Sequence, residues 1–215
     1  MKHVMKDVET CATHTSRSII LSVAAIPFEL TPEKPIMGTP DLWVLNVAPQ
    51  LMLKGRVFSR GTQKFWQDQP DGAAQHWEHP EKIIHPEELR GKLFEFINAL
   101  GNLSDPLDVA ANWMVDKVEI WANGDRFDIG NLENLMWEYA GDENRSPWAY
   151  NKVNDYRTYC RWNPKLREMP KELEFLGHDP TEDCKKQIWR LWEVATPQLM
   201  ADTVATPVVL DKIVT

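Results

Sequence analysis

HVMKDVE, residues 3–9, is the stretch of sequence that decides the fold, because its pattern predicts a strand carrying two carboxylates. Side chains at positions i and i+2 of a strand point to the same face. Asp7 and Glu9 therefore project together near the end of this strand. Two adjacent carboxylates repel each other unless a positive charge lies between them. A divalent cation such as Mg²⁺ or Mn²⁺, which prefers oxygen ligands, is the usual remedy. Alone, Asp-x-Glu is a weak pattern in so acidic a chain.

The segments around this strand predict an α/β architecture. Further strands are predicted where β-branched and aromatic residues gather, over residues 17–28, 42–47 and 115–121. Helices are predicted over residues 61–69, 86–100, 128–140 and 184–195. Loops rich in Pro, Gly or polar residues are predicted over residues 31–40 and 70–80. Strands followed by alternating helices and strands indicate a sheet with helices on its faces. Without a repeat or an obvious linker, we expect one domain over residues 1–215.

Composition narrows the class of protein. The formal net charge of −8 argues against a protein that holds nucleic acid by bulk positive charge. It does not exclude an enzyme that touches a few nucleotides, since carboxylates that bind cations raise the acidic count. The three cysteines form no CxxC pair, which favours a reducing cytoplasm. The longest apolar run, residues 19–28, is far shorter than the roughly 20 residues that span a bilayer.

Two more carboxylates follow at predicted helix starts. Asp128 ends the segment Asn123-Gly-Asp-Arg-Phe-Asp, which lies between a predicted strand and a predicted helix. Asp183 ends the segment His178-Asp-Pro-Thr-Glu-Asp. Asp residues often cap helices, and Asp179 before a proline fits that role well. This leaves Asp183 in the first helical turn, free to face a metal. Asp128 could likewise cap the helix that follows it, and Asp125 is an alternative to Asp128 as the functional carboxylate.

In order and context, these segments resemble the three motifs of the DEDDh 3′→5′ exonuclease family. The first motif is Asp7-Val-Glu9-Thr10, the second runs from Asn123 to Asp128, and the third is His-x4-Asp, from His178 to Asp183. The third motif marks the His subclass rather than the Tyr subclass. The resemblance implies a ribonuclease H-like mixed β-sheet flanked by helices on both faces.

Two further segments resemble the subgroup of phage exonuclease A and the mycobacterial exoribonuclease-like proteins. FWQDQ, residues 65–69, is similar to the WWxxQ segment of that subgroup. Pro147-Trp148 followed by Asp155-Tyr-Arg-Thr is similar to its PW…DxRT stretch. The resemblance covers roughly residues 3 to 195. Since dimers occur among the relatives, a homodimer is one expected form. The expected location is the cytoplasm, which is the host cytoplasm if a phage encodes the protein.

The resemblance implies a two-metal phosphodiester hydrolase using Mg²⁺ or Mn²⁺. Asp7, Glu9 and Asp183 would hold the first ion, while Asp7 would bridge to a second ion assisted by Asp128. His178 would be the general base, since imidazole exchanges protons near neutral pH. The substrate would be single-stranded nucleic acid, DNA slightly favoured over RNA, shortened from the 3′ end to nucleoside 5′-monophosphates. Candidate substrate-binding residues are Thr10, Trp66, Gln69, Asn123, Phe127 and Arg157.

Several alternatives stay open. Trp66 could stack on a base or pack in the core, and Arg157 could meet a phosphate or a structural carboxylate. Lys6 shares a strand face that should be buried, so its ammonium must reach a partner or an edge. A zinc site at His76, His79 and His85 is disfavoured, because no cysteine stands at ligand spacing. The rival functions are a non-catalytic nucleic-acid-binding module on the same fold and another metal-dependent phosphoesterase.

Overall fold

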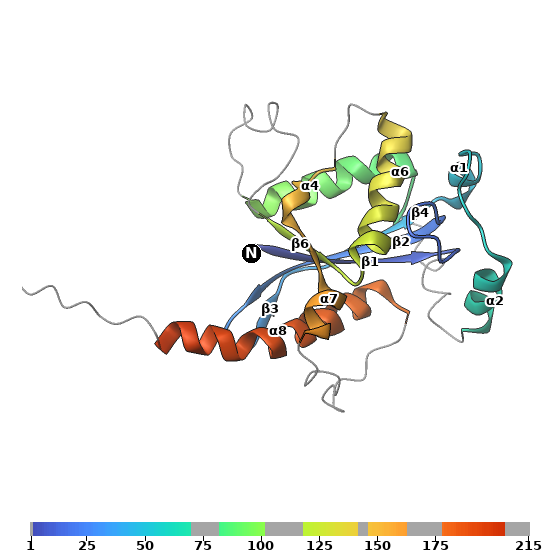
Figure 1. Ribbon diagram of the computed structural model, residues 1–215. Coiled ribbons are helices and arrows are strands. Elements are labelled where there is room, and N and C mark those ends of the chain that lie inside the picture. The colour runs from blue at the N-terminus through green and yellow to red at the C-terminus, as the bar shows by residue number, and fades with distance from the viewer. Residues whose placement is uncertain (1, 70–81, 102–117, 142–145, 163–177, 205–215) are drawn as a thin grey trace, which may run out of the picture.

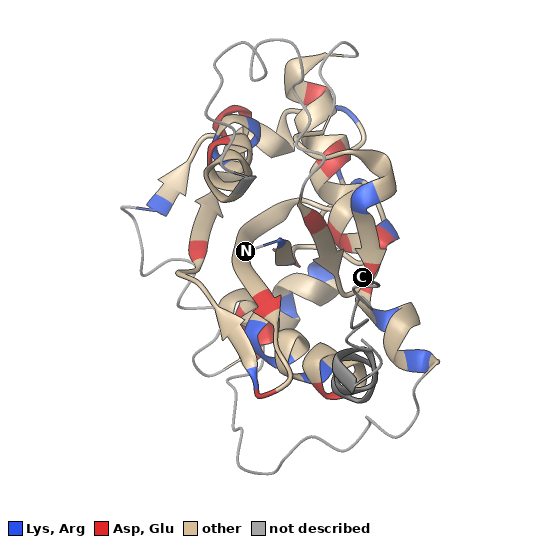
Figure 2. Cartoon of the chain, turned by 90° about the vertical axis from the view of Figure 1, so that its left-hand side faces the viewer, with Lys and Arg blue, Asp and Glu red and all other residues tan. Residues whose placement is uncertain are grey.

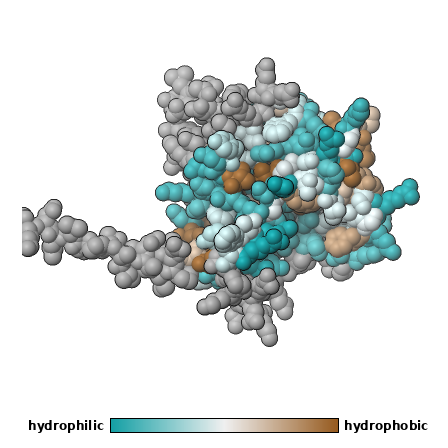
Figure 3. Space-filling model, viewed as in Figure 1, coloured by the Kyte–Doolittle hydropathy of each residue, from teal (hydrophilic) through white to brown (hydrophobic). Residues whose placement is uncertain are grey.

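The computed structural model describes residues 2–69, 82–101, 118–141, 146–162 and 178–204. The predicted loop over residues 70–80, the start of the strand predicted over 115–121, and the His76–His79 pair lie outside these ranges. Within them, no helix is both long enough and apolar enough to cross a membrane. The face seen in Figure 3 is mainly hydrophilic, with hydrophobic residues confined to small patches.

A mixed β-sheet forms the centre of the molecule. Its order is β5-β4-β2-β1-β6-β7, with β3 paired to β2. β1 pairs with β2 in antiparallel fashion and with β6 in parallel fashion, so β1 is a central strand. β7 continues the sheet beside β6, also in parallel. The strands are β1 (His3–Thr10), β2 (Ile20–Leu30), β3 (Pro35–Met37), β4 (Asp41–Leu45), β5 (Ile83–Ile84), β6 (Glu119–Ala122) and β7 (Val153–Asp155).

Helices cover both faces of the sheet (Figure 1). Above it in that view lie α4 and α6, and below it lie α7 and the long α8. The helices are α1 (Val47–Leu51), α2 (Arg60–Asp68), α4 (Leu89–Gly101), α6 (Gly130–Ala140), α7 (Tyr156–Arg161) and α8 (Pro180–Val204). Shorter turns are η2 (Pro86–Glu88), η3 (Asp125–Ile129) and η4 (Tyr150–Lys152). The predicted α/β class with a mixed, helix-flanked sheet is therefore confirmed.

The alternation of side chains along β1 divides the core between the two faces. Val4 and Val8 pack with Leu93 of α4 and Leu132 of α6 on one face. Met5 packs with residues of α8 on the other. Burying one such aliphatic side chain contributes about 1.5–3 kcal/mol to stability. Since α8 covers the face that Met5 shares with Asp7 and Glu9, this packing brings α8 to the carboxylates.

Most predicted elements are confirmed, with shifted ends. The strand predicted over residues 17–28 begins only at Ile20 and runs to Leu30, and the strand predicted over 42–47 ends at Leu45. The predicted loop over 31–40 was wrong in part, because Pro35–Met37 pairs with β2 as strand β3. An edge position tolerates proline at the first residue of a strand, which the composition of this segment concealed.

Lys6 is fully buried, on the strand face predicted for it. Its ammonium lies 3.5 Å from the centroid of the Trp148 ring, a cation–π contact. Burial lowers the pKa of Lys6 well below its usual value, while the nearby Glu133 acts in the opposite direction. Glu133 also accepts hydrogen bonds from the Trp148 indole (3.0 Å) and from Ser146 (2.8 Å). The partner that the sequence requires for Lys6 is thus an aromatic face backed by a carboxylate.

Candidate active site

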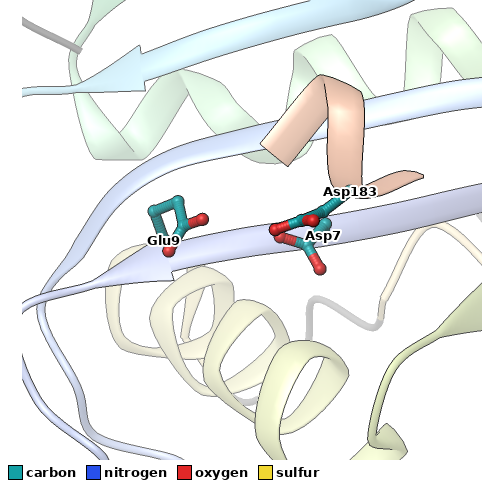
Figure 4. A group of neighbouring side chains, drawn as sticks. All are labelled: Asp7, Glu9 and Asp183. Carbon is teal, nitrogen blue, oxygen red and sulfur yellow. The ribbon is translucent and has the colours of Figure 1, made fainter. Parts of the chain in front are cut away.

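Three carboxylates from the two ends of the chain meet beside the centre of the sheet. Asp7 and Glu9 project from β1, and Asp183 projects from the first turn of α8 (Figure 4). One ligand atom of each lies within 4.8 Å of the other two. The residues paired with the carboxylates on the neighbouring strand β2 are small: Asp7 pairs with Ala24, and Glu9 pairs with Ser22. The register of β1 and β2 shifts between Glu9 and Thr10, the last residue of β1, so the pairing is irregular at the site.

Asp183 is directed to this cluster by the cap that begins α8. The carboxylate of Asp179 accepts hydrogen bonds from the backbone N–H groups of Thr181 (2.8 Å) and Glu182 (2.9 Å). The N–H of Asp183 donates to the Asp179 carbonyl at 2.8 Å, closing the first turn. The predicted cap at Asp179 is confirmed. Because that residue satisfies the free N–H groups of the helix start, Asp183 has no capping role.

Asp128 reaches the same pocket through an unusual turn. Gly124 has φ of 123°, a conformation that other residues rarely adopt, and its carbonyl accepts from the N–H groups of both Phe127 and Asp128 at 2.9 Å. The result is a π-helical turn, η3, ahead of α6, a form frequent at functional sites. Asp128 lies inside η3 and does not cap α6. Asp125, the sequence alternative, is exposed and does not line the pocket that Asp128 lines.

These carboxylates are largely buried and repel one another. Burial, and then repulsion from Asp183, raises the pKa of Asp7 to about 7, although a hydrogen bond from Gln187 lowers it in part. Burial also raises the pKa of Glu9 and of Asp128, each further repelled by Asp7. The pKa of Asp183 is raised by burial as well, against the opposing effect of nearby Lys186. Figure 2 shows acidic and basic residues interspersed over the described part of the chain.

This donor set fits a divalent metal. It consists of carboxylate oxygens, the ligands that Mg²⁺ and Mn²⁺ prefer. The Oδ2 atom of Asp128 is buried and has no hydrogen-bond partner among the described residues. A buried acceptor left without a partner costs free energy, which a cation in the pocket would offset. The structure therefore supports metal binding by these residues.

Without metal, we expect the protein to lose stability as pH rises from 5.5 to 8. Folding raises the pKa of Asp7 from 3.8 to about 7, so the folded chain holds more protons than the unfolded chain between those values. Asp7 thus stabilises the fold at low pH by a contribution that disappears as pH approaches 7. The loss for this group alone is about 2 kcal/mol, or roughly 4–8 °C in Tm.

Thermal unfolding in EDTA at both pH values measures this loss. The Asp7→Asn variant is the control, since it removes this titration and keeps the others. The pH 5.5 to 8 decrease in Tm should be smaller in Asp7→Asn than in the natural protein, and excess Mg²⁺ should abolish most of the difference. Equal decreases in the two proteins would show that folding does not raise the pKa of Asp7.

His178 lies above the cluster in a constrained position. It is exposed, lines the same pocket and has φ of 65°, the left-handed region that non-glycine residues seldom occupy. Its backbone N–H donates a hydrogen bond to Asp183. Its ring packs edge-on against Phe65 of α2, with centroids 4.8 Å apart. Residues far apart in sequence thereby hold the imidazole at the mouth of the pocket.

The pocket has a volume of about 590 Å³, within the range of roughly 300–1,000 Å³ found for small-molecule sites. Of the predicted substrate-binding residues, five line it, and Gln69 does not. Gln69 is the C-cap of α2, where the chain turns out of the helix with ψ of 126°. The five residues that line the pocket are Thr10, Trp66, Asn123, Phe127 and Arg157.

The structure favours the core-packing alternative for Trp66. Its side chain is only 8% exposed and packs with Cys11 and Ile19. Its indole N–H donates to the carbonyl of Thr10 at 2.9 Å, so the ring ties α2 to the end of β1. Arg157 is exposed and donates to the Asn123 side chain at 3.4 Å, while its charge also lowers the pKa of Asp128.

Two residues of this site are not among those predicted from the sequence. Gln187 donates to Oδ1 of Asp7 at 2.9 Å, with both side chains buried. It stands four residues after Asp183 on α8, so helical spacing could have placed both on one face. Phe65 is 37% exposed and lines the pocket, whereas the residue predicted there was the neighbouring Trp66. Which of two adjacent aromatic residues turns inward depends on how α2 packs, which the sequence pattern does not show.

Comparison with known families identifies one match over most of the chain. The family described as "3'-5' exoribonuclease Rv2179c-like domain" matches residues 2–195. The matched region includes every residue of the pocket. No curated protein sequence matches the chain.

Solved structures of exonuclease I share the fold. One, which concerns how processivity is achieved, has a TM-score of 0.60 and 16% identity, covering 94% of this chain and 43% of its own. The complex of E. coli exonuclease I with a dT13 oligonucleotide has a TM-score of 0.59, with the same identity and coverage. This chain thus spans less than half of the exonuclease I chains. At such low identity the likeness shows the fold alone, and it confirms the predicted ribonuclease H-like arrangement.

Proposed function

Since the chain belongs to the family of 3'-5' exoribonuclease Rv2179c-like domains, we propose that it is a metal-dependent 3′→5′ exonuclease of single-stranded nucleic acid. The observation that carries this proposal is the meeting of Asp7, Glu9 and Asp183 within 4.8 Å. Asp128 and His178 line the same pocket. Four carboxylates and one imidazole are the groups that two-metal phosphodiester hydrolysis needs. The intact set argues against the non-catalytic binding module.

The carboxylates are assigned to metal binding. Asp7, Glu9 and Asp183 would hold one ion, and Asp7 with Asp128 would hold a second. Two Mg²⁺ or Mn²⁺ ions bound there would supply a water nucleophile at neutral pH and offset charge on the phosphoryl group. Gln187 fixes the Asp7 carboxylate through Oδ1 and leaves the other oxygen free to bind metal.

His178 is assigned as the general base. It accepts a proton on an imidazole nitrogen from the water that attacks the terminal phosphodiester. The bond between phosphorus and the 3′ oxygen of the preceding nucleotide then breaks, and the departing oxygen takes up a proton from solvent. The products are a nucleoside 5′-monophosphate and a chain shorter by one nucleotide with a free 3′ hydroxyl. The contacts of His178 with Phe65 and Asp183 limit how far its ring can move, which favours proton transfer from a positioned water.

The substrate is assigned as a single-stranded 3′ end. The net charge of −8 leaves little attraction for long duplexes, so contacts near the pocket must provide the affinity. Family membership favours RNA. The sequence-based preference for DNA remains the second candidate, supported by the dT13 oligonucleotide in the complex of exonuclease I.

We expect release of nucleoside monophosphates from 3′-labelled single strands to require a divalent metal. RNA and DNA of matched sequence are incubated with the protein in Mg²⁺ or Mn²⁺, and the products are resolved by chromatography. EDTA should suppress the rate to the background, since the carboxylates alone provide no nucleophile. Restoring excess Mn²⁺ should recover the rate.

The outcomes separate the candidate functions. Faster release from RNA assigns the exoribonuclease, and faster release from DNA assigns the deoxyribonuclease. Binding of either strand without release in any metal would support the non-catalytic module. Release that continues unchanged in EDTA would contradict the assignment of the four carboxylates.

A further inference from the structure

A second hollow, of about 790 Å³, adjoins the candidate active site. The turn over residues 123–128 and the first turn of α7 contribute to both. Asn123, Phe127 and Arg157 line the active-site pocket, whereas Asp125, Arg126 and Thr158 line the second hollow. Figure 1 shows α7 directly after β7, at the edge of the sheet. The two hollows are therefore separated only by one turn of chain and one helix end.

Aromatic side chains form much of the second hollow. They are Trp121 of β6, Tyr159 of α7 and Trp162 just after α7. Trp121 is held in place, since its ring meets Tyr159 edge-on at 5.7 Å and its indole N–H donates to His3 at 3.3 Å. Trp162 is 82% exposed. A fixed aromatic wall beside an exposed indole is suited to stacking of bases, which is largely independent of sequence.

The wall between the two hollows carries two arginines that suit the phosphates of a nucleic-acid strand. Arg126 is exposed in its lining, and Arg157 is exposed on the active-site side of the same wall. Two carboxylates also line the hollow and keep their negative charge, so the phosphates must lie on the arginine side; hydrogen bonds hold both carboxylates in place. Asp155 accepts from the N–H and the hydroxyl of Thr158, each at 3.1 Å, and Asp125 accepts from the backbone N–H of Arg126 at 2.7 Å. In a chain with a net charge of −8, two arginines on one wall create a local positive potential that attracts phosphates.

We propose that this hollow binds the nucleotide immediately 5′ of the one held in the active site, with its base against Trp162 and Tyr159. Arg126 and Arg157 contact the phosphates that pass over the intervening wall. The inference rests on the proposed function, because it assigns the upstream part of the same single strand. Such a site would add affinity for the strand beyond the terminal nucleotide, in a protein whose net charge of −8 otherwise opposes binding of a polyanion.

Two substrates of different length test the proposal. A single-stranded 12-mer reaches both hollows, whereas the p-nitrophenyl ester of thymidine 5′-monophosphate reaches only the active site. We expect Trp162→Ala to lower the ratio of kcat/KM for the 12-mer to kcat/KM for the ester by about 5- to 100-fold, the effect of losing one stacked base. Tyr150→Ala is the matched control, because Tyr150 is 88% exposed and lies outside both hollows. Its ratio should equal that of the natural protein.

Binding provides a readout that does not need catalysis. Fluorescence anisotropy of a labelled 12-mer in EDTA should show weaker binding by Trp162→Ala than by Tyr150→Ala. Arg126→Ala should reduce the slope of log affinity against log salt by about 0.7, the contribution of one phosphate in a single strand. An unchanged ratio and affinity in Trp162→Ala, or an equal loss in Tyr150→Ala, would overturn the proposal. If the natural protein hydrolyses neither substrate, the proposed function fails, and the anisotropy alone then decides on this site.

Discussion

Asp7→Asn should lower kcat/KM for single-stranded substrate by about 10³-fold or more, the largest effect expected of any single substitution. Loss of about 4 kcal/mol of transition-state stabilisation corresponds to this factor, and a metal site provides several kcal/mol. Asp7 interacts electrostatically with the other carboxylates of the site. After burial, its charge is the largest cause of the raised pKa of both Glu9 and Asp128. An asparagine keeps the shape and can still accept from Gln187, so the fold is preserved.

Stability distinguishes this loss from unfolding. Removing one buried negative charge should raise the Tm of the metal-free protein at pH 8 and should diminish the rise in Tm that Mn²⁺ produces. Asp68→Asn is the matched control, because Asp68 is exposed on α2 and does not line the pocket. Activity within tenfold of the natural protein in Asp7→Asn would remove Asp7 from the metal site.

His178→Gly should lower kcat by about 10²- to 10⁴-fold, the usual contribution of a positioned general base. Glycine is chosen because the backbone at this position has φ of 65°, which glycine adopts without strain. The variant should therefore fold at least as well as the natural protein. Its Mn²⁺-dependent rise in Tm should stay nearly unchanged, since the three clustered carboxylates remain.

The comparison of these two variants separates metal binding from proton transfer. Asp7→Asn should lose both activity and metal-dependent stabilisation, whereas His178→Gly should lose activity alone. Exogenous imidazole should restore part of the rate in His178→Gly and none in Asp7→Asn. A His178→Gly protein with a rate near that of the natural protein would exclude the imidazole as the base.

The sequence by itself determined the parts of the site that depend on local geometry. Alternation along a strand placed Asp7 and Glu9 on one face, and Lys6 on the other, whatever the rest of the chain does. The Asp-Pro pair at residues 179–180 determined where α8 begins and left Asp183 free. The succession of predicted strands and helices indicated the α/β class, and the resemblance to the exonuclease family implied the ribonuclease H-like sheet. Apart from that resemblance, these features act over a few residues or one element, so backbone geometry is enough to predict them.

Tertiary structure alone decided which side chains meet across long stretches of chain. It turned Trp66 into the core and left Phe65 beside His178, although both residues are aromatic neighbours on α2. It supplied Gln187 as the partner of Asp7 and placed Gln69 outside the pocket. Each of these outcomes depends on how a helix is rotated and shifted against the sheet. That placement is set by the packing of the whole core, because close-packed side chains leave few orientations in which every buried group finds its partners.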